Sequence, residues 1–302
     1  MVHQILLIYN PKAGKGIFLT KLADVIDMFV KGGYTVEVYP TQAPGDAVKK
    51  ISALPSYIDM IVAAGGDGTL DEVVTGLMQS GRDVPIAYIP VGSTNDFAAS
   101  LGLSTNIIEA VGDILGGEPR GVDVGMFNGD NFVYVAAFGA FTDVAYETNQ
   151  DMKNIFGHIA YIMEGARRLG DIKSYMMTVT VNRRVIHQDY IFGMITNSTS
   201  VGGIRNITGQ EVKLDDGLFE VTLIHNPKNI IEFQEIIGSL LMGNADTDLV
   251  DSFKTDHIII ESTQKVPWTL DGEYGGEHAT VAVTNRKMGM RIVLDGKQAA
   301  IL

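Results

Sequence analysis

A glycine-rich segment around one aspartate carries the clearest chemistry in this chain: Gly65-Gly66-Asp67-Gly68-Thr69. An apolar run over 59–64 precedes it, and apolar residues at helical spacing follow over 71–78, which predicts a link between a buried strand and a helix. Glycines let backbone amides approach an anion, and a helix N-terminus adds positive dipole, so the segment is typical of a phosphate site. A carboxylate beside phosphate is repulsive unless a cation lies between them. Asp67 therefore predicts a divalent metal, bound directly or through water, and the segment indicates a nucleotide held with magnesium.

A second loop, residues 10–16, follows the first apolar run of the chain. It lacks the spacing and the terminal Lys-Ser/Thr pair of a Walker loop. Its glycines and the two lysines, Lys12 and Lys15, still suit a phosphate group. A plain turn between a strand and a helix explains the same residues about equally well.

A third loop, residues 90–98, follows another apolar run. Ser93 or Thr94 would be an ordinary helix cap, and that interpretation is the simpler one for this loop alone. Next to the glycine-rich segment and the lysines, Asn95 and Asp96 are interpreted as contacts to a nucleotide and to metal-bound water.

The last loop with possible chemistry is Asp271-Gly272-Glu273. Asp-Gly is a common hairpin turn, so a solvated turn is an equal alternative. A kinase that acts on an alcohol needs a base within hydrogen-bond reach of the hydroxyl, and Glu273 could be that base. Such a kinase also needs cations to neutralise the charge on the transferred phosphoryl group.

The elements that must position these loops change in kind near residue 125. Before it, strand-like and helix-like segments alternate, which predicts a doubly wound parallel α/β domain with its ligand at the carboxyl ends of the strands. After it, period-two alternation predicts an antiparallel β-sandwich or distorted barrel with two inserted helices. We expect a nucleotide-binding domain over 1–125 and a β domain over 126–302, whose last strand could return to the first domain. The expected strands of the second half are 132–137, 176–181, 190–196, 219–224, 257–260, 280–283 and 291–294, and its helices are 156–169 and 230–242.

Composition and charge exclude several classes of protein. Of the 302 residues, 46% are hydrophobic and 20% are charged, which is ordinary for a folded chain long enough for two domains. The net charge of −13 argues against a nucleic-acid partner and against simple electrostatic docking on an anionic membrane. Because cysteine is absent, disulfides and thiolate zinc sites are excluded, which fits a reducing compartment.

The apolar runs do not suggest a membrane span or a leader. The start of the chain has no basic region before its short apolar run, so we expect no signal peptide. The longest apolar stretch, 132–141, is about half of what a membrane span needs. We expect a cytoplasmic protein with transient peripheral contact at the inner face of the membrane.

Taken together and in order, these residues resemble the soluble bacterial diacylglycerol kinase family, which is related to sphingosine and ceramide kinases. The resemblance covers essentially the whole chain. Gly-Gly-Asp-Gly alone is less specific, because NAD kinases and phosphofructokinases share it. The motifs that carry the resemblance to the diacylglycerol kinase family are Asn10-Pro11-x-x-Gly14, Gly65-Gly66-Asp67-Gly68-Thr69, Pro90-x-Gly92-Ser93-x-Asn95-Asp96-Phe97-Ala98 and Asp271-Gly272-Glu273.

The resemblance implies that ATP and Mg²⁺ bind to the first domain and that a lipid enters against the β domain. It implies that Glu273 is the catalytic base, with Asp271 beside it. It places Asp67, Asp96 and Asp123 in a network that holds magnesium waters, although Asp123 alone could be an ordinary acid at a strand edge. The nucleotide contacts that it implies are Asn10, Pro11, Lys12, Ala13, Gly14, Thr41, Ser93 and the 65–71 stretch with Gly65, Gly66, Asp67, Gly68 and Thr69. Asn95 joins this set through the interpretation of its own loop given above.

The family also has a structural metal, whose ligands here would be the Asp216 carboxylate and the Leu218 carbonyl. In some relatives an acid three residues earlier is a third ligand, but this chain has Lys213 there. The site is therefore weakened or absent, or it recruits Asp215. An Asp-Gly turn that leads into the next strand is an equal alternative.

Two departures from the family pattern lie in the nucleotide loops. Ser93 replaces the usual threonine and keeps the hydroxyl. Asp71 replaces the usual asparagine, which adds negative charge near the phosphates.

These observations predict a lipid kinase that moves the γ-phosphoryl of ATP to a lipid primary hydroxyl, with diacylglycerol giving phosphatidic acid. Alternatives are another lipid, such as phosphatidylglycerol or a sphingoid base, or a nucleotide- or lipid-sensing regulator with little turnover. We expect the apolar helix 230–242 to be buried against the sandwich, with an interfacial or homodimer role as the alternative. Membrane contact could use a local basic patch at Arg167-Arg168 or Arg183-Arg184.

Overall fold

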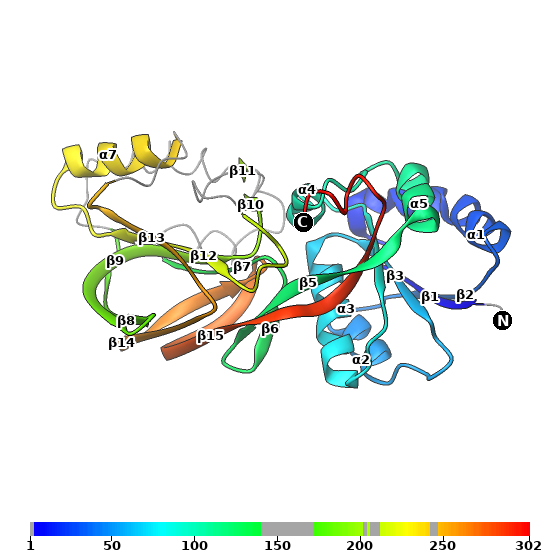
Figure 1. Cartoon of the computed structure of the whole chain (residues 1–302), viewed down its shortest axis with the longest axis horizontal. Helices are drawn as coiled ribbons and strands as arrows, with labels where there is room; N and C mark the ends of the chain where they lie inside the picture. The colour runs from blue at the N-terminus through cyan, green and yellow to red at the C-terminus, as the bar shows by residue number, and fades with distance from the viewer. Residues whose placement is uncertain (1–2, 140–171, 202–203, 206–211, 242–246) are drawn as a thin grey trace. The chain divides into compact units, whose positions relative to one another are not determined.

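The structure is a computed structural model that describes residues 3–139, 172–201, 204–205, 212–241 and 247–302. The chain forms two compact units (Figure 1). Unit 1 comprises Met1–Asp123 and Lys287–Leu302, and unit 2 comprises Val124–Arg286. The last residues of the chain therefore belong with the first ones.

Unit 1 is built on a parallel sheet in the order β2-β1-β3-β4. Every residue of β3 and β4 is buried, as expected for central strands that are covered on both faces. Tyr9 pairs with Ala64, and Gly65 pairs with Pro90, so β1, β3 and β4 end at the same edge of the sheet. The strands are β1 (His3–Tyr9), β2 (Tyr34–Pro40), β3 (Met60–Gly65) and β4 (Ile86–Pro90).

Helices cover both faces of this sheet (Figure 1). The helices α1 (Leu22–Lys31) and α5 (Ile107–Gly116) pack together on one face, and α2 (Asp46–Ser52) and α3 (Asp67–Ser80) pack together on the other. The predicted doubly wound α/β fold is therefore confirmed. Two short helical segments, η1 (Ala13–Thr20) and α4 (Asp96–Ser100), follow β1 and β4 directly.

Unit 2 is an antiparallel sandwich in which four strands pair in a ring. β8 pairs with β9 and β14, and β7 also pairs with β9 and β14. β9 closes this ring because it is long: its first half pairs with β8 and its second half with β7 and β12. The strands wholly within unit 2 are β6 (Asp130–Phe132), β7 (Val135–Gly139), β8 (Tyr175–Val181), β9 (Arg184–Thr196), β10 (Ser200–Val201), β11 (Ile204–Arg205), β12 (Phe219–His225), β13 (Val250–Thr255) and β14 (His257–Leu270). Two further strands have residues in both units: β5 (Glu118–Phe127) and β15 (Glu273–Leu294), whose Ile292 pairs with Ile86 of β4.

Aromatic side chains fill the interior of the sandwich. Trp268 is 1% exposed, and its ring centroid lies 5.1 Å from that of Phe127 and 4.8 Å from that of Phe138. The helix α7 (Ile230–Leu241) buries Phe233, Ile236 and other apolar residues, as the sequence pattern predicts. The predicted helix 156–169 lies outside the described residues.

Three predicted strands differ from the structure. The expected strand 132–137 is interrupted between Phe132 and Val135, because backbone N–H groups there donate to a side chain instead of a neighbouring strand. The expected strands 280–283 and 291–294 are parts of one long strand, β15. No helix in the described part of the chain is long and apolar enough to cross a membrane.

Candidate active site

Three loops of unit 1 lie side by side at the carboxyl ends of β1, β3 and β4. The Asn10 N–H donates to the Ala64 carbonyl at 3.1 Å, and the Val91 N–H donates to the Gly65 carbonyl at 2.8 Å. The loops that leave these strands are the glycine-rich segments around Gly14, Gly65 and Gly92. Strand pairing therefore brings segments far apart in the sequence to one edge of the sheet.

Glycine is required at two of these positions because the loop backbones touch. A methyl group on Gly14 would lie 2.1 Å from the carbonyl oxygen of Val91, and Gly14 has a φ of 55°. A methyl group on Gly92 would lie 2.5 Å from the Cα of Gly66. Any larger residue would push the loops apart, so the loops meet backbone to backbone and leave amide groups close to whatever binds there.

The loop after β1 is closed by its own asparagine. Asn10 Oδ1 accepts the N–H of Lys12 at 2.9 Å, and the Asn10 carbonyl accepts the N–H of Ala13 at 3.2 Å. Pro11 lies inside this turn. The side chains of Lys12 and Lys15 are exposed, so both ammonium groups can reach an anion.

The other predicted nucleotide contacts lie along the same edge. Gly68 and Thr69 form the first turn of α3, where the Thr69 N–H donates to the Gly66 carbonyl at 3.0 Å. Ser93 is exposed in the loop after β4. Thr41 follows β2, and its N–H donates to the carbonyl of Tyr9 at the end of β1, at 2.9 Å.

Asp67 and Asp96 are neighbouring acids in these loops, with Asp67 half-buried and Asp96 buried. Asp67 Oδ2 accepts the N–H of Asp96 at 3.1 Å, and Oδ1 accepts the N–H of Phe97 at 3.4 Å. Asp96 is 1% exposed. Burial, together with the nearby charge of Asp96, raises the pKa of Asp67 to about 6, although the backbone N–H groups oppose the shift.

These acids fit a magnesium ion that arrives with a phosphate ligand. Among the described residues, no lysine or arginine interacts with Asp67, and no group of three or more His, Asp or Glu side chains is gathered to hold a metal. Mg²⁺ is usually held by one or two carboxylates together with phosphate oxygens and water. A cation beside Asp67 and Asp96 would offset the repulsion that raises the pKa of Asp67.

Asn95 shapes the loop after β4. Its Oδ1 accepts the N–H of Gly92 at 2.9 Å, and its Nδ2 donates to the Gly92 carbonyl at 3.0 Å. Asn95, with a φ of 53°, is the N-cap of α4, so the cap predicted at Ser93 or Thr94 is wrong. Because the Asn95 amide is bonded within the loop and the residue is 6% exposed, Asn95 positions the loop.

Asp123 lies at the end of the first stretch of unit 1. It is fully buried, and its Oδ1 accepts the N–H of Met288 at 2.7 Å. This bond joins the chain leaving unit 1 to the chain that returns to it.

Asp271 anchors a hairpin in unit 2. Asp271 and Gly272 have φ of 49° and 83°, and Leu270 pairs with Glu273, so the two residues form a two-residue hairpin turn. The turn is not solvated, because Asp271 is 5% exposed. Its carboxylate accepts the N–H groups of three consecutive residues, Val133, Tyr134 and Val135, at 2.5, 2.9 and 2.9 Å.

Glu273 begins β15 directly after this anchored turn. Its side chain is exposed, unlike that of Asp271 two residues earlier. The hairpin therefore presents one carboxylate to solvent and fixes its own backbone with the other.

The residues predicted for a structural metal fit a divalent ion poorly. Asp216 Oδ1 accepts the N–H of Leu218 at 2.8 Å, and Asp216 Oδ2 lies 3.6 Å from Lys254 Nζ. The same ammonium lies 3.0 Å from the buried carboxylate of Glu220, whose pKa burial raises to about 7 while Lys254 opposes the shift. A lysine already supplies positive charge here. Asp215 is half-buried beside this group.

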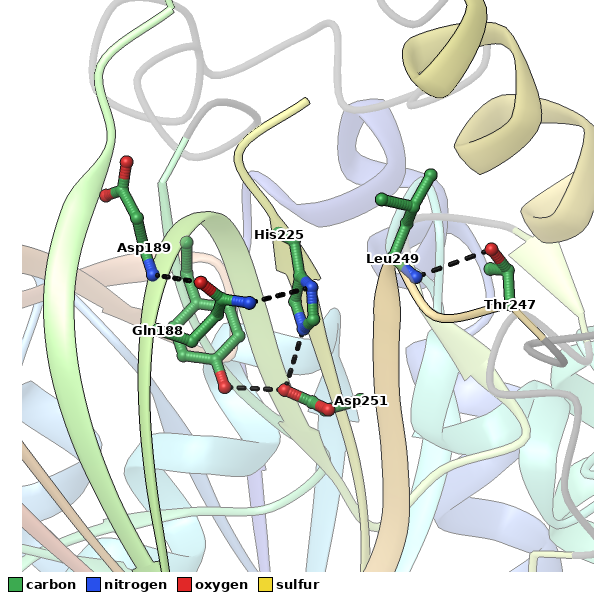
Figure 2. A network of polar contacts seen from close by, with 7 residues as sticks. Gln188, Asp189, His225, Thr247, Leu249 and Asp251 are labelled. Carbon is green, nitrogen blue, oxygen red and sulfur yellow. Dashed lines mark hydrogen bonds and ion pairs between the residues drawn. The ribbon is translucent and has the colours of Figure 1, made fainter. Parts of the chain in front are cut away.

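A polar network in unit 2 carries no signal in the sequence, because its residues lie on three different strands (Figure 2). Asp251 Oδ2 accepts the Tyr190 hydroxyl at 2.6 Å and lies 2.9 Å from His225 Nε2. Gln188 Oε1 accepts the N–H of Asp189, and Gln188 Nε2 lies 3.1 Å from His225 Nδ1. Despite burial, the bonds from His225 and Tyr190 lower the pKa of Asp251. The network ties β9, β12 and β13 together.

Comparison with known proteins agrees with this arrangement. The family model of the diacylglycerol kinase catalytic domain matches residues 4–127. The model of the YegS C-terminal NAD kinase beta sandwich-like domain matches residues 135–294.

Whole-length relatives show the same relationship. The chain is 32% identical over 274 residues to the diacylglycerol kinase of Bacillus subtilis, covering 89% of each chain. It is 32% identical over 273 residues to the diacylglycerol kinase of Staphylococcus carnosus, covering 90% of this chain and 89% of that one. The crystal structure of a diacylglycerol kinase from Bacillus anthracis superposes with a TM-score of 0.77 at 25% identity, covering 99% of this chain and 98% of that one. The chain therefore belongs to the bacterial diacylglycerol kinase family and is a diacylglycerol kinase-like lipid kinase.

Proposed function

We propose that this protein transfers the γ-phosphoryl group of ATP to the primary hydroxyl of a lipid, with diacylglycerol as the acceptor and phosphatidic acid as the product. The observation that carries the proposal is the half-buried Asp67, which is hydrogen-bonded to the backbone of the buried Asp96 among loops that meet backbone to backbone. No lysine or arginine of the described residues acts on Asp67, and such an acid beside closely packed glycines suits a phosphate that brings its own metal.

Unit 1 would hold the nucleotide. Backbone amides of the three loops and the ammonium groups of Lys12 and Lys15 would bind the phosphates, and Ser93 and Thr41 would contact the rest of ATP. Asp67 and Asp96 would hold the waters of Mg²⁺, which supplies positive charge to the transferred phosphoryl group when it is bound.

Unit 2 would supply the base. Glu273 takes the proton from the lipid hydroxyl, the resulting oxygen bonds to the γ-phosphorus, and the bond to ADP breaks. Asp271 does not need to touch the substrate. Because its carboxylate is bonded to three backbone N–H groups, its part is to hold the turn that carries Glu273.

Diacylglycerol is favoured as the acceptor because the relatives in Bacillus and Staphylococcus bear that name. Another lipid alcohol, such as phosphatidylglycerol or a sphingoid base, would use the same residues. A regulator with little turnover is less favoured, since it would not need an exposed Glu273 on a hairpin fixed by buried hydrogen bonds.

Membrane contact would use a local basic surface, because the net charge is −13. Of the two predicted patches, Arg167-Arg168 lies outside the described residues. Arg183 and Arg184 lie at the turn between β8 and β9, next to Val185, which is 57% exposed. Vesicle binding that survives reversal of both charges would contradict this role.

The test is phosphoryl transfer from labelled ATP with Mg²⁺ to a panel of lipids in mixed micelles. The proteins compared are wild type, Glu273→Gln and a matched control, Glu277→Gln, which changes another exposed glutamate of β15. Labelled phosphatidic acid from wild type and the control, but not from Glu273→Gln, is the expected result. Label on another lipid would change the acceptor, and no label on any lipid with ATP still bound would favour the regulator.

A further inference from the structure

Glu72, in α3, is bonded to the start of a different helix. Its Oε1 accepts the N–H of Gly45 at 2.7 Å, and its Oε2 accepts the N–H of Ala47 at 3.1 Å. The N-cap of α2 is Gly45, with a φ of 77° and no side chain that could accept these bonds. Glu72 therefore supplies from α3 the cap that α2 lacks.

The same face of α3 holds α2 one turn further along. A methyl group on Gly76 would lie 2.9 Å from both the Cβ of Ile51 and the carbonyl oxygen of Val48. Residues four apart lie on one face of a helix, so Glu72 and Gly76 face α2 together. The two helices are thus held by hydrogen bonds at the start of α2 and by close contact beyond it.

The loop before α2, residues 41–45, is fixed at both ends. At β1, Thr41 N–H donates to the carbonyl of Tyr9. At α2, Asp46 accepts the N–H of Gln42 at 2.9 Å and the hydroxyl of Tyr39 at 3.1 Å. A further attachment is Glu72, which belongs to α3, the helix that follows the glycine-rich loop after β3.

The order of the strands sets the distance between the two loops that Glu72 connects, and this distance can be compared with the length of a nucleotide. The sheet runs β2-β1-β3, so the loops after β2 and β3 are two strand spacings apart, about 10 Å. A nucleotide with its phosphates at residues 65–69 would need about this length to bring its nucleoside to residues 41–45.

We infer that Glu72 is a positioning residue that sets the nucleoside-binding loop 41–45 relative to the phosphate-binding loop 65–69. The inference rests on the proposed binding of ATP. It predicts that Glu72 affects recognition of the nucleoside while leaving the binding of the phosphates unchanged.

The test compares Glu72→Gln and Glu72→Ala with wild type in binding Mg-ATP and Mg-tripolyphosphate, measured by calorimetry. In Glu72→Gln, an amide nitrogen would face one of the two N–H donors. We expect the Kd of Mg-ATP to rise about five- to tenfold, the size of a lost helix cap, and that of Mg-tripolyphosphate to change less than about twofold. Hydrogen exchange at Gly45 and Ala47 should become faster in both variants.

Glu109→Gln is the matched control. Glu109 lies on α5, and its carboxylate accepts the hydroxyl of Ser104 at 2.9 Å, so the change removes a comparable charge and bond from another helix of unit 1. Both Kd values should equal those of wild type. An unchanged Kd for Mg-ATP in Glu72→Gln, or an equal loss for both ligands, would overturn the inference alone. A wild-type chain that binds no ATP would overturn the proposed function, and the inference with it.

Discussion

The acids Asp67 of unit 1 and Asp251 of unit 2 have pKa values that are shifted in opposite directions. In unit 1, burial and the charge of Asp96 raise the pKa of Asp67 to about 6. In unit 2, Asp271 accepts three backbone N–H groups, and side-chain hydrogen bonds lower the pKa of Asp251 despite its burial. Glu220, also in unit 2, resembles Asp67 in that burial raises its pKa, to about 7, but Lys254 lies 3.0 Å from it and opposes the shift.

Asp271 and Asp251 stabilise the fold of unit 2 through their hydrogen bonds, whereas we propose that Asp67 serves a bound cation. The turn that Asp271 holds also carries the exposed Glu273. In unit 1, the change in the pKa of Asp67 from 3.8 to about 6 corresponds to about 3 kcal/mol against its charged form at neutral pH. A bound cation would remove much of this cost, and perturbed acids of this kind are typical of functional sites.

The largest expected effect is that of Asp67→Asn. The change removes the negative charge that would hold magnesium waters, so phosphoryl transfer should fall by at least about a hundredfold. Steady-state rates at several Mg²⁺ concentrations measure it. Asp59→Asn is the matched control, because Asp59 also accepts a backbone N–H, from Gln4 at 2.8 Å, but is exposed. Equal rates for Asp67→Asn and wild type would contradict a special role for the acids of unit 1.

The next largest effect is expected for Asp271→Ala. It leaves the N–H groups of Val133, Tyr134 and Val135 without their acceptor, which should lower the free energy of unfolding by about 2–4 kcal/mol. The rate of transfer should also fall, with the KM of ATP unchanged, because the turn before Glu273 is loosened. Denaturant unfolding and initial rates test this, and Asp271→Asn should recover part of both. Full stability in Asp271→Ala would show that unit 2 does not depend on this acid.

Glu220 should make the stability of unit 2 depend on pH. Its folded pKa of about 7 lies above its ordinary value of 4.5, so the folded chain binds more protons between these values. The contribution of Glu220 to the free energy of unfolding should therefore be fully present below pH 4.5. Up to about 3 kcal/mol of this contribution should be lost as the pH rises through 7. Unfolding at pH 5 and pH 8 measures the loss, which Glu220→Gln should reduce. The same pH dependence in variant and wild type would assign it to other groups.

The smallest effect is expected for Asp71→Asn. Removing one negative charge near the phosphates should lower the apparent KM of ATP by about two- to fivefold. Initial rates over a range of ATP concentrations check this. An unchanged or higher KM would show that the negative charge of Asp71 does not weaken the binding of ATP.

The sequence predicts the loops of unit 1 well because their chemistry is local. Glycines, an acid and a hydroxyl lie within a few positions of each other, and alternation of strands and helices predicts that the loops share one edge of a sheet. The same local pattern does not reveal that the Asn95 side chain is hydrogen-bonded to Gly92 or that Asn95 is the N-cap of α4, because Ser93 and Thr94 are equally good N-cap residues by type.

The sequence predicts less of unit 2 because its bonds join distant positions. Asp271 accepts N–H groups that lie 136 to 138 residues earlier in the chain. No local pattern around Asp271 or around residues 133–135 predicts this contact. His225 and Asp251 likewise meet only because β12 and β13 pair. The cap that Glu72 gives to α2 is missed for the same reason, since only helix packing brings the two helices together.

The comparison between the units is tested most directly by calorimetric titration of ATP, with and without Mg²⁺, into wild type, Asp67→Asn and Glu273→Gln. If unit 1 keeps its acids for a nucleotide-bound cation and unit 2 supplies the base, Glu273→Gln should bind ATP as tightly as wild type and with the same dependence on Mg²⁺. Asp67→Asn should bind ATP weakly and lose that dependence. Normal Mg²⁺-dependent binding by Asp67→Asn, together with weak binding by Glu273→Gln, would contradict this division of roles.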